Sequence, residues 1–461
     1  MSIFKACDIR GVVGAEWGEA EARDIGKGLA LMAQSQGRPE ICVAGDFRRS
    51  TAGLKQSLID GITSAGTSVI DFGHCPTPVA YFATMHRNLD SVAIVTASHN
   101  PGRYNGIKFM IGGQPAVPDI VAQLQQFMLE PVAAKKRGRI DPFDAIPVYE
   151  SWVAEQCIAG SPPVQSSSPV SIVLDTMHGA FAQVAPRVLR AAGCDVTAFG
   201  DTIDPDFTDR SPNPAADANL KMLVGAVRKQ NADAGIALDG DGDRVVFVDR
   251  RGGIIRPEQI AAILIRSGPA NPRVIYDLKC ASLVPRVTRE AGGTAVMRPS
   301  GHGFIKTSMI REGADWGVEV SGHHFFRALH GGDDGLFAAL TILALMRHTG
   351  KSLDELVAPF PWPLITPDLR IPFTGDSAAM IARIADRCGG AISRLDGVRA
   401  EYPLGWGLAR TSITEPAVTF RFEGPDAGGL IDIATSMLAG AGDLKDTVLE
   451  AIHEWFARSA D

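Results

Sequence analysis

The chain has 461 residues, of which 45% are hydrophobic and 21% are charged, and its formal net charge is −7. This length exceeds that of one ordinary hydrophobic core and predicts several domains, and the composition is that of a globular protein rather than a disordered one. The acidic net charge argues against a general nucleic-acid binder, which needs an excess of basic surface, but not against a protein that binds small anions.

The seven cysteines are scattered along the chain, and no two of them form a CxxC pair. This pattern is typical of a reducing compartment and predicts neither a disulfide framework nor a zinc cluster. The amino terminus lacks the apolar core of a signal peptide, and the best apolar run, 336–346, has the length of a buried helix. We therefore expect a cytoplasmic protein with no membrane partner.

Short apolar runs alternate with segments of helical periodicity along the chain. We predict a strand at 41–44, a helix that Ser50 caps and that runs to about residue 65, a strand at 92–96, a helix at 120–129, a strand at 170–174, helices at 181–192 and 220–229, and a strand at 235–238. The alternation resumes through 260–265, 274–276, 284–291 and 316–320. Such alternation predicts α/β domains with parallel or mixed sheets.

Three segments have the composition of domain boundaries. They are the Ser- and Pro-rich 159–170, the turn 249–253 and the proline-rich 359–367, although a domain could begin some fifteen residues before the first. We predict domains at 1–145, 146–252, 253–362 and 363–461. The first three are expected to be similar mixed α/β domains, and the last a smaller α+β domain.

Polar loops directly follow three of the apolar strands, at 93–101, 235–244 and 316–324. Ligand sites of α/β sheets form at the carboxyl ends of strands, so these loops are candidates for a site. The second loop contains Asp239, Asp241 and Asp243, separated by glycines. Three carboxylates at alternate positions form a hard oxygen cluster suited to Mg²⁺, and their repulsion would be costly without a cation.

This loop has two alternatives to a magnesium site. An EF-hand is excluded, because its sixth and twelfth positions would be Arg244 and Arg250 instead of glycine and an acidic residue. A solvated acidic turn is possible, since Asp-Gly pairs are common in turns. The metal site is favoured, because a simple turn does not explain three evenly spaced acids after a strand.

Ser98 is the candidate nucleophile. It lies in the first loop, between Thr96 and Pro101, where we expect it to be exposed. The loop lacks the Gly-x-Ser-x-Gly pattern of a nucleophile elbow, and the adjacent His99 cannot readily act as the base of a catalytic triad. Taken alone, Ser98 fits a helix N-cap equally well. Together with a tri-aspartate metal site, a phosphorylated serine makes a coherent centre for phosphoryl transfer.

The sequence resembles the α-D-phosphohexomutases in five motifs that occur in the order of that superfamily. They are FKACDIRGVVG at 4–14, TASHNP at 96–101, DGDGDR at 239–244, EVSGH at 319–323 and RTSITEP at 410–416. The resemblance implies four domains around a central cleft, each contributing one loop. It also implies that Ser98 carries the phosphoryl group, passes it to a sugar hydroxyl through a hexose 1,6-bisphosphate, and recovers the other phosphoryl group.

The same resemblance implies a role for each matching residue. Asp239, Asp241 and Asp243 would hold Mg²⁺ with a phosphoserine oxygen of Ser98. Glu319 and Ser321 would bind sugar hydroxyls. The non-reacting phosphate would be held by Arg410, Ser412 and Thr414, and further substrate contacts would come from Arg244, Lys279 and His302.

General acid and base duty stays open among three residues, Lys108, His323 and Arg10. An arginine is a poor proton donor, so Arg10 is better suited to stabilising the transferring charge. The ligands are expected to be small-molecule hexose phosphates, and the protein a monomer or dimer. The residues after Glu319 resemble the branch of phosphomannomutases and phosphoglucomutases. The alternatives are a phosphoglucosamine mutase and, in a different class, a non-catalytic sugar-phosphate binding protein.

Overall fold

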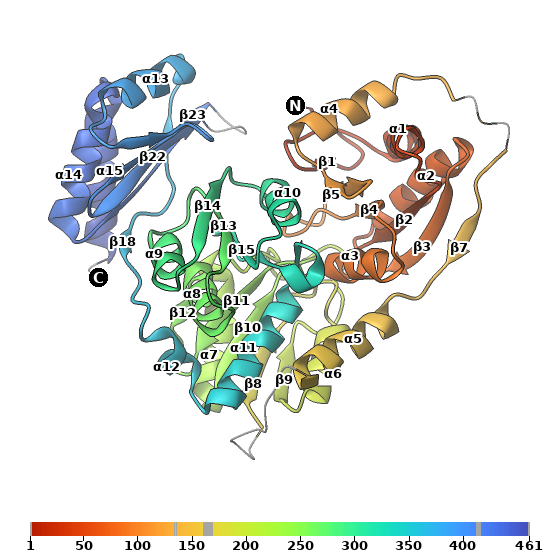
Figure 1. The fold of residues 1–461 in the computed structure, drawn as a ribbon, viewed down its shortest axis with the longest axis horizontal. Helices are drawn as coiled ribbons and strands as arrows, with labels where there is room; N and C mark the ends of the chain where they lie inside the picture. Colours follow the sequence, from red (N-terminus) through yellow and green to blue (C-terminus); the bar gives the residue numbers. More distant parts are fainter. Residues whose placement is uncertain (1, 133, 135, 160–168, 412–415, 460–461) are drawn as a thin grey trace. The chain divides into compact units, whose positions relative to one another are not determined.

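The computed structural model describes residues 2–132, 134, 136–159, 169–411 and 416–459 (Figure 1). The chain divides into two compact units. The first contains residues 1–264 and 301–359, and the second contains residues 265–300 and 360–461. Each unit has its own buried hydrophobic residues, including two clusters in the first unit and one cluster in the second.

The first unit begins with a mixed sheet and its covering helices. The strands are β1 (Ile9–Val12), β2 (Glu40–Gly45), β3 (Ser68–His74), β4 (Val92–Val95), β5 (Tyr104–Ile111), β6 (Gln114–Pro115) and β7 (Ile140–Pro142). The helices are α1 (Glu19–Ser35), α2 (Thr51–Ser64), α3 (Thr77–His86), α4 (Pro118–Phe127) and α5 (Ile146–Ala159). The strand order is β1-β5-β4-β2-β3-β7, with β6 beside β5; β2 is parallel to β3 and β4, whereas β5 is antiparallel to β4.

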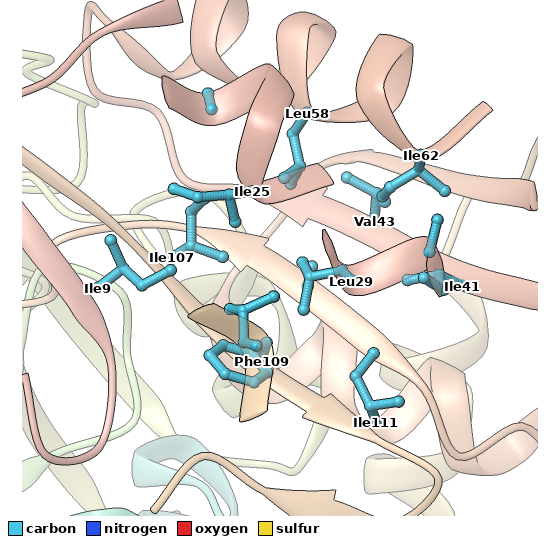
Figure 2. Packing of buried hydrophobic residues seen from close by; sticks show 14 of the residues in the cluster. Ile9, Ile25, Leu29, Ile41, Val43, Leu58, Ile62, Ile107, Phe109 and Ile111 are labelled. Atoms are coloured by element: carbon cyan, nitrogen blue, oxygen red, sulfur yellow. The ribbon is translucent and has the colours of Figure 1, made fainter. Parts of the chain in front are cut away.

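The core of this sheet lies against α1 and α2 (Figure 2). Ile25 and Leu29 of α1 belong to the same buried cluster as Phe109 of β5. The two helices pack so closely that a Cβ atom on Gly26 would lie 2.3 Å from the Leu58 carbonyl oxygen. Glycine at this position therefore permits the contact that covers the sheet.

A second sheet in the first unit carries the acidic loop. Its strands are β8 (Ser171–Asp175), β9 (Asp195–Phe199), β10 (Ala234–Leu238), β11 (Val245–Asp249) and β12 (Ile254–Ile255), in the order β12-β11-β10-β8-β9. The helical segments are α6 (Val184–Ala191), the 3₁₀ helix η1 (Asp217–Leu220) and α7 (Lys221–Gln230). The next helix, α8 (Pro257–Ser267), contains the boundary between the two units. The segment 249–253 is the turn that joins β11 to β12, so the sheet continues beyond it.

The remainder of the first unit follows residue 300. It contains α10 (His302–Glu312), β15 (Trp316–Val318), β16 (His324–Phe326), η2 (Arg327–Leu329), β17 (Gly332–Asp333), α11 (Gly335–Thr349) and α12 (Leu353–Val357). β16 is antiparallel to both β15 and β17.

The second unit combines a short α/β segment with the carboxy-terminal α+β domain. The first part contains β13 (Arg273–Asp277), α9 (Leu283–Glu290) and β14 (Thr294–Arg298), and its two strands are parallel. The second part contains β18 (Leu364–Ile365), β19 (Leu369–Pro372), α13 (Ser377–Arg387), β20 (Ala391–Ser393), β21 (Val398–Tyr402), β22 (Gly405–Thr411), β23 (Ala417–Gly424), α14 (Ala427–Met437), η3 (Leu438–Gly440) and α15 (Leu444–Ser459). Its sheet has the order β18-β23-β22-β21-β20, with β19 beside β23.

The predicted fold class, three mixed α/β domains and a carboxy-terminal α+β domain, is confirmed. The predicted helix at 181–192 begins later, at Val184, and the predicted strand at 92–96 ends at Val95. The four domain ranges predicted above stay a prediction. Among the described residues, no helix combines the length and apolar character needed to cross a membrane.

Candidate active site

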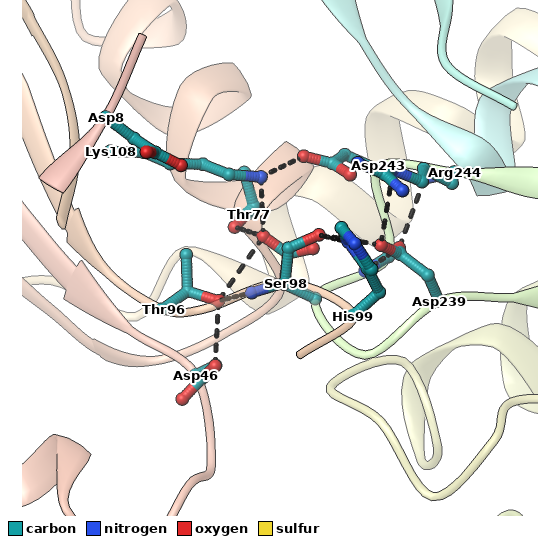
Figure 3. Close-up of polar contacts among 12 residues, drawn as sticks. Asp8, Asp46, Thr77, Thr96, Ser98, His99, Lys108, Asp239, Asp243 and Arg244 are labelled. Atoms are coloured by element: carbon teal, nitrogen blue, oxygen red, sulfur yellow. Dashed lines mark hydrogen bonds and ion pairs between the residues drawn. The ribbon is translucent and has the colours of Figure 1, made fainter. Parts of the chain in front are cut away.

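The loops that follow β4 and β10 meet within the first unit. The Ser98 hydroxyl donates a hydrogen bond to Asp239 Oδ2 at 2.9 Å (Figure 3). The side chains of Asp239, Asp241 and Asp243 each offer a carboxylate oxygen within 4.8 Å of the others. The structure thus brings the predicted nucleophile into direct contact with the predicted metal site.

Ser98 lies in a tight turn between β4 and β5. It does not cap a helix, and its side chain is not exposed. The residue is only 1% exposed, so the expectation of an exposed serine is wrong. The acidic loop of the second sheet covers it. His99 Nδ1 lies 3.3 Å from the Ser98 Oγ atom. Burial, and then the charges of Arg244 and Arg10, hold the pKa of His99 well below its usual value, so this imidazole is neutral.

The three aspartates differ in their hydrogen-bond partners. Asp239 Oδ1 accepts backbone N–H groups from Gly242 at 2.9 Å and from Arg244 at 3.2 Å. Asp241 Oδ1 and Asp243 Oδ1 are buried and have no hydrogen-bond partner among the described residues. Burial and the neighbouring carboxylates raise the pKa of Asp239 to about 7. Orphaned oxygens in a dry acidic cluster are the donor set that a hard divalent cation prefers, so the residues fit a metal.

Lys108 reaches the triad from β5. Its Nζ atom lies 2.8 Å from Asp241 Oδ2 and also contacts Asp243 Oδ2. Although burial opposes the charge, Asp241 and Asp243 raise the pKa of Lys108 above its usual value. In turn, Lys108 and the Thr77 hydroxyl outweigh burial and lower the pKa of Asp241. The two carboxylates therefore favour the charged form of Lys108.

His323 joins the triad to a second buried group. Its Nε2 atom accepts a hydrogen bond from Arg244 Nε at 2.9 Å, and its Nδ1 atom lies 2.8 Å from Asp333 Oδ2. Because an arginine Nε always carries its proton, the hydrogen bond from Arg244 assigns the Nδ1–H tautomer to the neutral ring. Lys306 lies 3.5 Å from Asp333 and 3.0 Å from the centre of the Tyr81 ring. Burial opposes protonation of His323, but the Asp243 charge and the contact with Asp333 raise its pKa.

The other predicted residues of the first unit lie around this centre. Arg10 donates to Asn100 Oδ1 at 2.9 Å and pairs with Asp8, beside the Ser98 loop. Glu319 Oε1 accepts from the Ser321 hydroxyl at 2.9 Å, and Glu319 Oε2 is buried without a partner among the described residues. His302, at the start of α10, has its ring centre 6.0 Å from that of His323.

The predicted residues of the second unit form ion pairs there. Lys279 lies 3.2 Å from Asp368, and Arg410 lies 3.1 Å from Asp396. Ser412 and Thr414 lie outside the described residues. The structure therefore brings together the sequence candidates of the first unit, whereas Lys279 and Arg410 belong to the second.

The sequence assigned no individual role to five residues that contact the site. Thr77 donates to Asp241 Oδ2 at 2.7 Å, and Asp46, Arg48, Lys306 and Asp333 support the serine loop or His323. A signal existed for Asp46 and Arg48, because they directly follow β2, at the carboxyl end of a strand. Lys306 and Asp333 follow no such pattern.

A buried serine that faces an acidic cluster able to hold a metal ion, in an α/β protein, is the arrangement of a phosphoryl-transfer site. Comparison with known families agrees. Models of the phosphoglucomutase/phosphomannomutase α/β/α domains I, II and III match residues 1–132, 154–253 and 256–361. The chain belongs to the phosphoglucomutase/phosphomannomutase family and is a phosphohexose mutase.

Similar proteins match along most of the chain. A phosphomannomutase/phosphoglucomutase of Pseudomonas aeruginosa is 34% identical, over 92% of this chain and 91% of its own length. A phosphoglucomutase of Neisseria gonorrhoeae is 33% identical, over 91% of this chain and 92% of its own length. The crystal structure of a phosphoglucomutase/phosphomannomutase family protein from Burkholderia thailandensis has a TM-score of 0.86 at 32% identity, and covers 96% of this chain and 98% of that chain.

Proposed function

We propose that this mutase moves a phosphoryl group reversibly between O1 and O6 of mannose phosphates, and also of glucose phosphates, through phosphorylated Ser98. The observation that carries the proposal is the 2.9 Å contact between Ser98 Oγ and Asp239 in a cluster with orphaned carboxylate oxygens. In each half-reaction the bond between phosphorus and the donor oxygen breaks, and a new bond forms to the acceptor oxygen. The proton of the acceptor hydroxyl passes to a base of the site, and the departing donor oxygen takes up a proton from an acid of the site.

Mg²⁺ is the proposed metal, because the donor set consists only of hard oxygens. Asp239, Asp241 and Asp243 would hold it together with a phosphate oxygen on Ser98. A bound Mg²⁺ would withdraw negative charge from the phosphoryl group. A hexose 1,6-bisphosphate is proposed as the activator, because it would phosphorylate Ser98 and leave a monophosphate.

Charge stabilisation and proton transfer are proposed for the basic side chains of the site. The raised pKa and double ion pairing of Lys108 favour a charge-stabilising role. Of the three candidates for proton transfer, His323 is the best supported, since Arg244 and Asp333 fix the orientation of its ring. Arg10, held beside the serine loop, is proposed to stabilise the transferring charge.

Substrate contacts are proposed for both units. Glu319, whose Oε2 atom lacks a partner among the described residues, and Ser321 would accept and donate hydrogen bonds to sugar hydroxyls. Arg244 and His302 would add contacts near the reacting phosphate. In the second unit Arg410 remains a proposed ligand of the non-reacting phosphate, with Ser412 and Thr414, and Lys279 remains a further proposed substrate contact.

Phosphoglucosamine mutase is the less favoured alternative, since the relatives described above are named for mannose and glucose phosphates. A non-catalytic sugar-phosphate binding protein is also less favoured, because the intact serine and triad would serve no purpose in it. The six described free cysteines support a cytoplasmic location. A monomer or dimer without a nucleic-acid partner is the proposed state.

The test is turnover of mannose 1-phosphate, glucose 1-phosphate and glucosamine 1-phosphate, with Mg²⁺ and a trace of the matching bisphosphate, followed by ³¹P NMR. Ser98→Ala should abolish turnover, and Ser57→Ala, at a buried serine of α2, is the matched control. Comparable turnover of the first two substrates supports the proposal. If only glucosamine 1-phosphate were turned over, the protein would be a phosphoglucosamine mutase instead. Absence of turnover by protein that mass spectrometry shows to be phosphorylated at Ser98 would contradict the mutase function.

A further inference from the structure

The loop that carries Ser98 has an unfavourable backbone conformation. Ser98 has a φ of 51°, in the left-handed region that is strained for a residue with a side chain. Surrounding contacts must therefore hold the loop. We propose that Asp46 and Arg48, which directly follow β2, are positioning residues that fix the Ser98 loop for phosphoryl transfer. This inference rests on the proposed role of Ser98 as the phosphoryl carrier.

Arg48 binds the loop through its main-chain carbonyls. Its Nη2 atom donates to the carbonyl oxygens of Ser98 and Asn100, each at 2.7 Å. Its Nη1 atom donates to those of Pro101 at 2.9 Å and Tyr104 at 3.2 Å. The Arg48 side chain is 0% exposed, so water does not compete for these hydrogen bonds. A single guanidinium thus satisfies four carbonyls on the segment from Ser98 to the start of β5.

Asp46 supports the backbone N–H group of Ser98 through Thr96. Its carboxylate accepts from Arg48 Nε at 3.0 Å and from the Thr96 hydroxyl at 2.7 Å (Figure 3). The same Thr96 oxygen accepts the Ser98 backbone N–H at 3.0 Å. The Thr96 hydroxyl also lies 3.4 Å from Asp241 Oδ2, so its proton is directed at carboxylates and a lone pair of its oxygen is directed at the Ser98 N–H. Both the N–H and the C=O of Ser98 are therefore tied to the buried Asp46–Arg48 pair.

The chemistry of this support is specific to arginine. A planar guanidinium with separated donors can reach several carbonyls at once, whereas an ammonium group is a point donor. The Arg48 guanidinium also lies 4.8 Å from the centre of the Phe207 ring, which restricts it further. If the support is lost, the backbone of Ser98 can relax to negative φ and its hydroxyl turns away from Asp239. A displacement of about 1 Å at a reacting atom can lower the rate about 100-fold.

The first experiment compares Arg48→Met and Arg48→Lys with Arg49→Met. Arg49 is the matched control, because it is the neighbouring arginine, its side chain is 74% exposed, and it pairs with Asp206. Mutase kcat and KM are measured with the hexose phosphate that the wild type turns over best. We expect kcat to fall about 10- to 100-fold in Arg48→Met with KM within about 3-fold, a smaller loss in Arg48→Lys, and wild-type values in Arg49→Met.

The second experiment covers the case in which Arg48→Met does not fold. Thr96→Val removes the hydroxyl that joins Asp46 to Ser98 at nearly constant volume, and Thr96→Ser keeps that hydroxyl. Thr96→Val should lose kcat about 10-fold or more with little change in KM, and Thr96→Ser should restore it. Wild-type kcat in folded Arg48→Met or in Thr96→Val would overturn the inference. The inference would also be overturned if the loss of kcat in a variant were no larger than the loss of folded protein.

Amide hydrogen exchange separates this inference from the proposed function. The Ser98 amide should exchange faster in Arg48→Met and Thr96→Val than in wild type or Arg49→Met. If the wild type shows no mutase turnover, the proposed function fails, and the exchange result alone then decides whether the pair holds the loop. Unchanged exchange at Ser98 in both variants would overturn the inference even in an active enzyme.

Discussion

Replacement of Lys108 by methionine tests the electrostatic design of the site. Lys108 Nζ lies 2.8 Å from Asp241 and also contacts Asp243, and its side chain is 2% exposed. Methionine preserves much of the side-chain volume and removes the charge. Among the described residues, the three buried aspartates then keep Arg244, 3.8 Å from Asp239, and the imidazole of His323, 3.5 Å from Asp243. We therefore expect Lys108→Met to destabilise the metal-free protein strongly.

The size of the effect follows from the burial of the pair. Removing one partner of a buried ion pair costs about 3–5 kcal/mol, because the remaining charge stays buried and uncompensated. For a domain of this size each kcal/mol lowers Tm by about 2–4 °C, so a loss of about 6 °C or more is expected in EDTA. Excess Mg²⁺ should recover more Tm in the variant than in the wild type, since the cation replaces the missing charge and no longer meets repulsion from Lys108.

The assay is thermal unfolding of wild type and variant, each in EDTA and in excess Mg²⁺. Lys55→Met is the matched control, because Lys55 lies 2.6 Å from Asp71 with its side chain 10% exposed, in the same amino-terminal sheet domain. Its loss of Tm should be equal in EDTA and in Mg²⁺. An Mg²⁺ response of Lys108→Met no larger than that of the wild type would refute the reasoning that Lys108 and the metal neutralise the same carboxylates.

Two further predictions concern residues outside the triad. Burial lowers the pKa of His324 to about 3 from 6.5, so the unfolded chain binds more protons between these values, and stability is lost as pH falls below 6.5. His324→Asn should reduce the stability difference between pH 7 and pH 5 by about 2 kcal/mol in urea unfolding, and an unchanged difference would contradict this. Arg399 lies 3.8 Å from the Trp406 ring and donates to the Cys280 carbonyl at 3.1 Å, on the turn that carries Lys279. Arg399→Met should raise KM for the hexose phosphate about 10-fold with a smaller change in kcat, and an unchanged KM in steady-state kinetics would show that this turn needs no such support.

The contact between Ser98 and Asp239 could be predicted because both residues follow strands. In α/β domains the carboxyl ends of strands gather the ligand-binding loops, so polar residues after β4 and β10 were the natural candidates. The fold class followed from the same alternation of strands and helices. The burial of Ser98 could not be predicted, because it depends on how the loop of the second sheet covers the first.

Other parts of the site depend on packing between segments far apart in the chain. Lys306 lies on α10 and Asp333 on β17, and each alone looks like an ordinary surface charge in the sequence. Only the folded chain places Asp333 against His323 and buries Lys306 beside it. Similarly, the sequence predicts a turn at 249–253 but not that β12 pairs with β11 across it, so that one sheet continues beyond the turn.

The contact between Ser98 and Asp239 also links phosphorylation to metal binding. In the structure Asp239 Oδ2 accepts the proton of the Ser98 hydroxyl at 2.9 Å. A phosphoserine ester has no proton on this oxygen, so Asp239 Oδ2 would lose its donor and join the orphaned Oδ1 atoms of Asp241 and Asp243. The added phosphate would also bring negative charge against three buried carboxylates, which only a cation can offset. We therefore expect Mg²⁺ to bind the phosphorylated protein more tightly than the unphosphorylated one, with one oxygen of Asp239 serving either the serine proton or the metal.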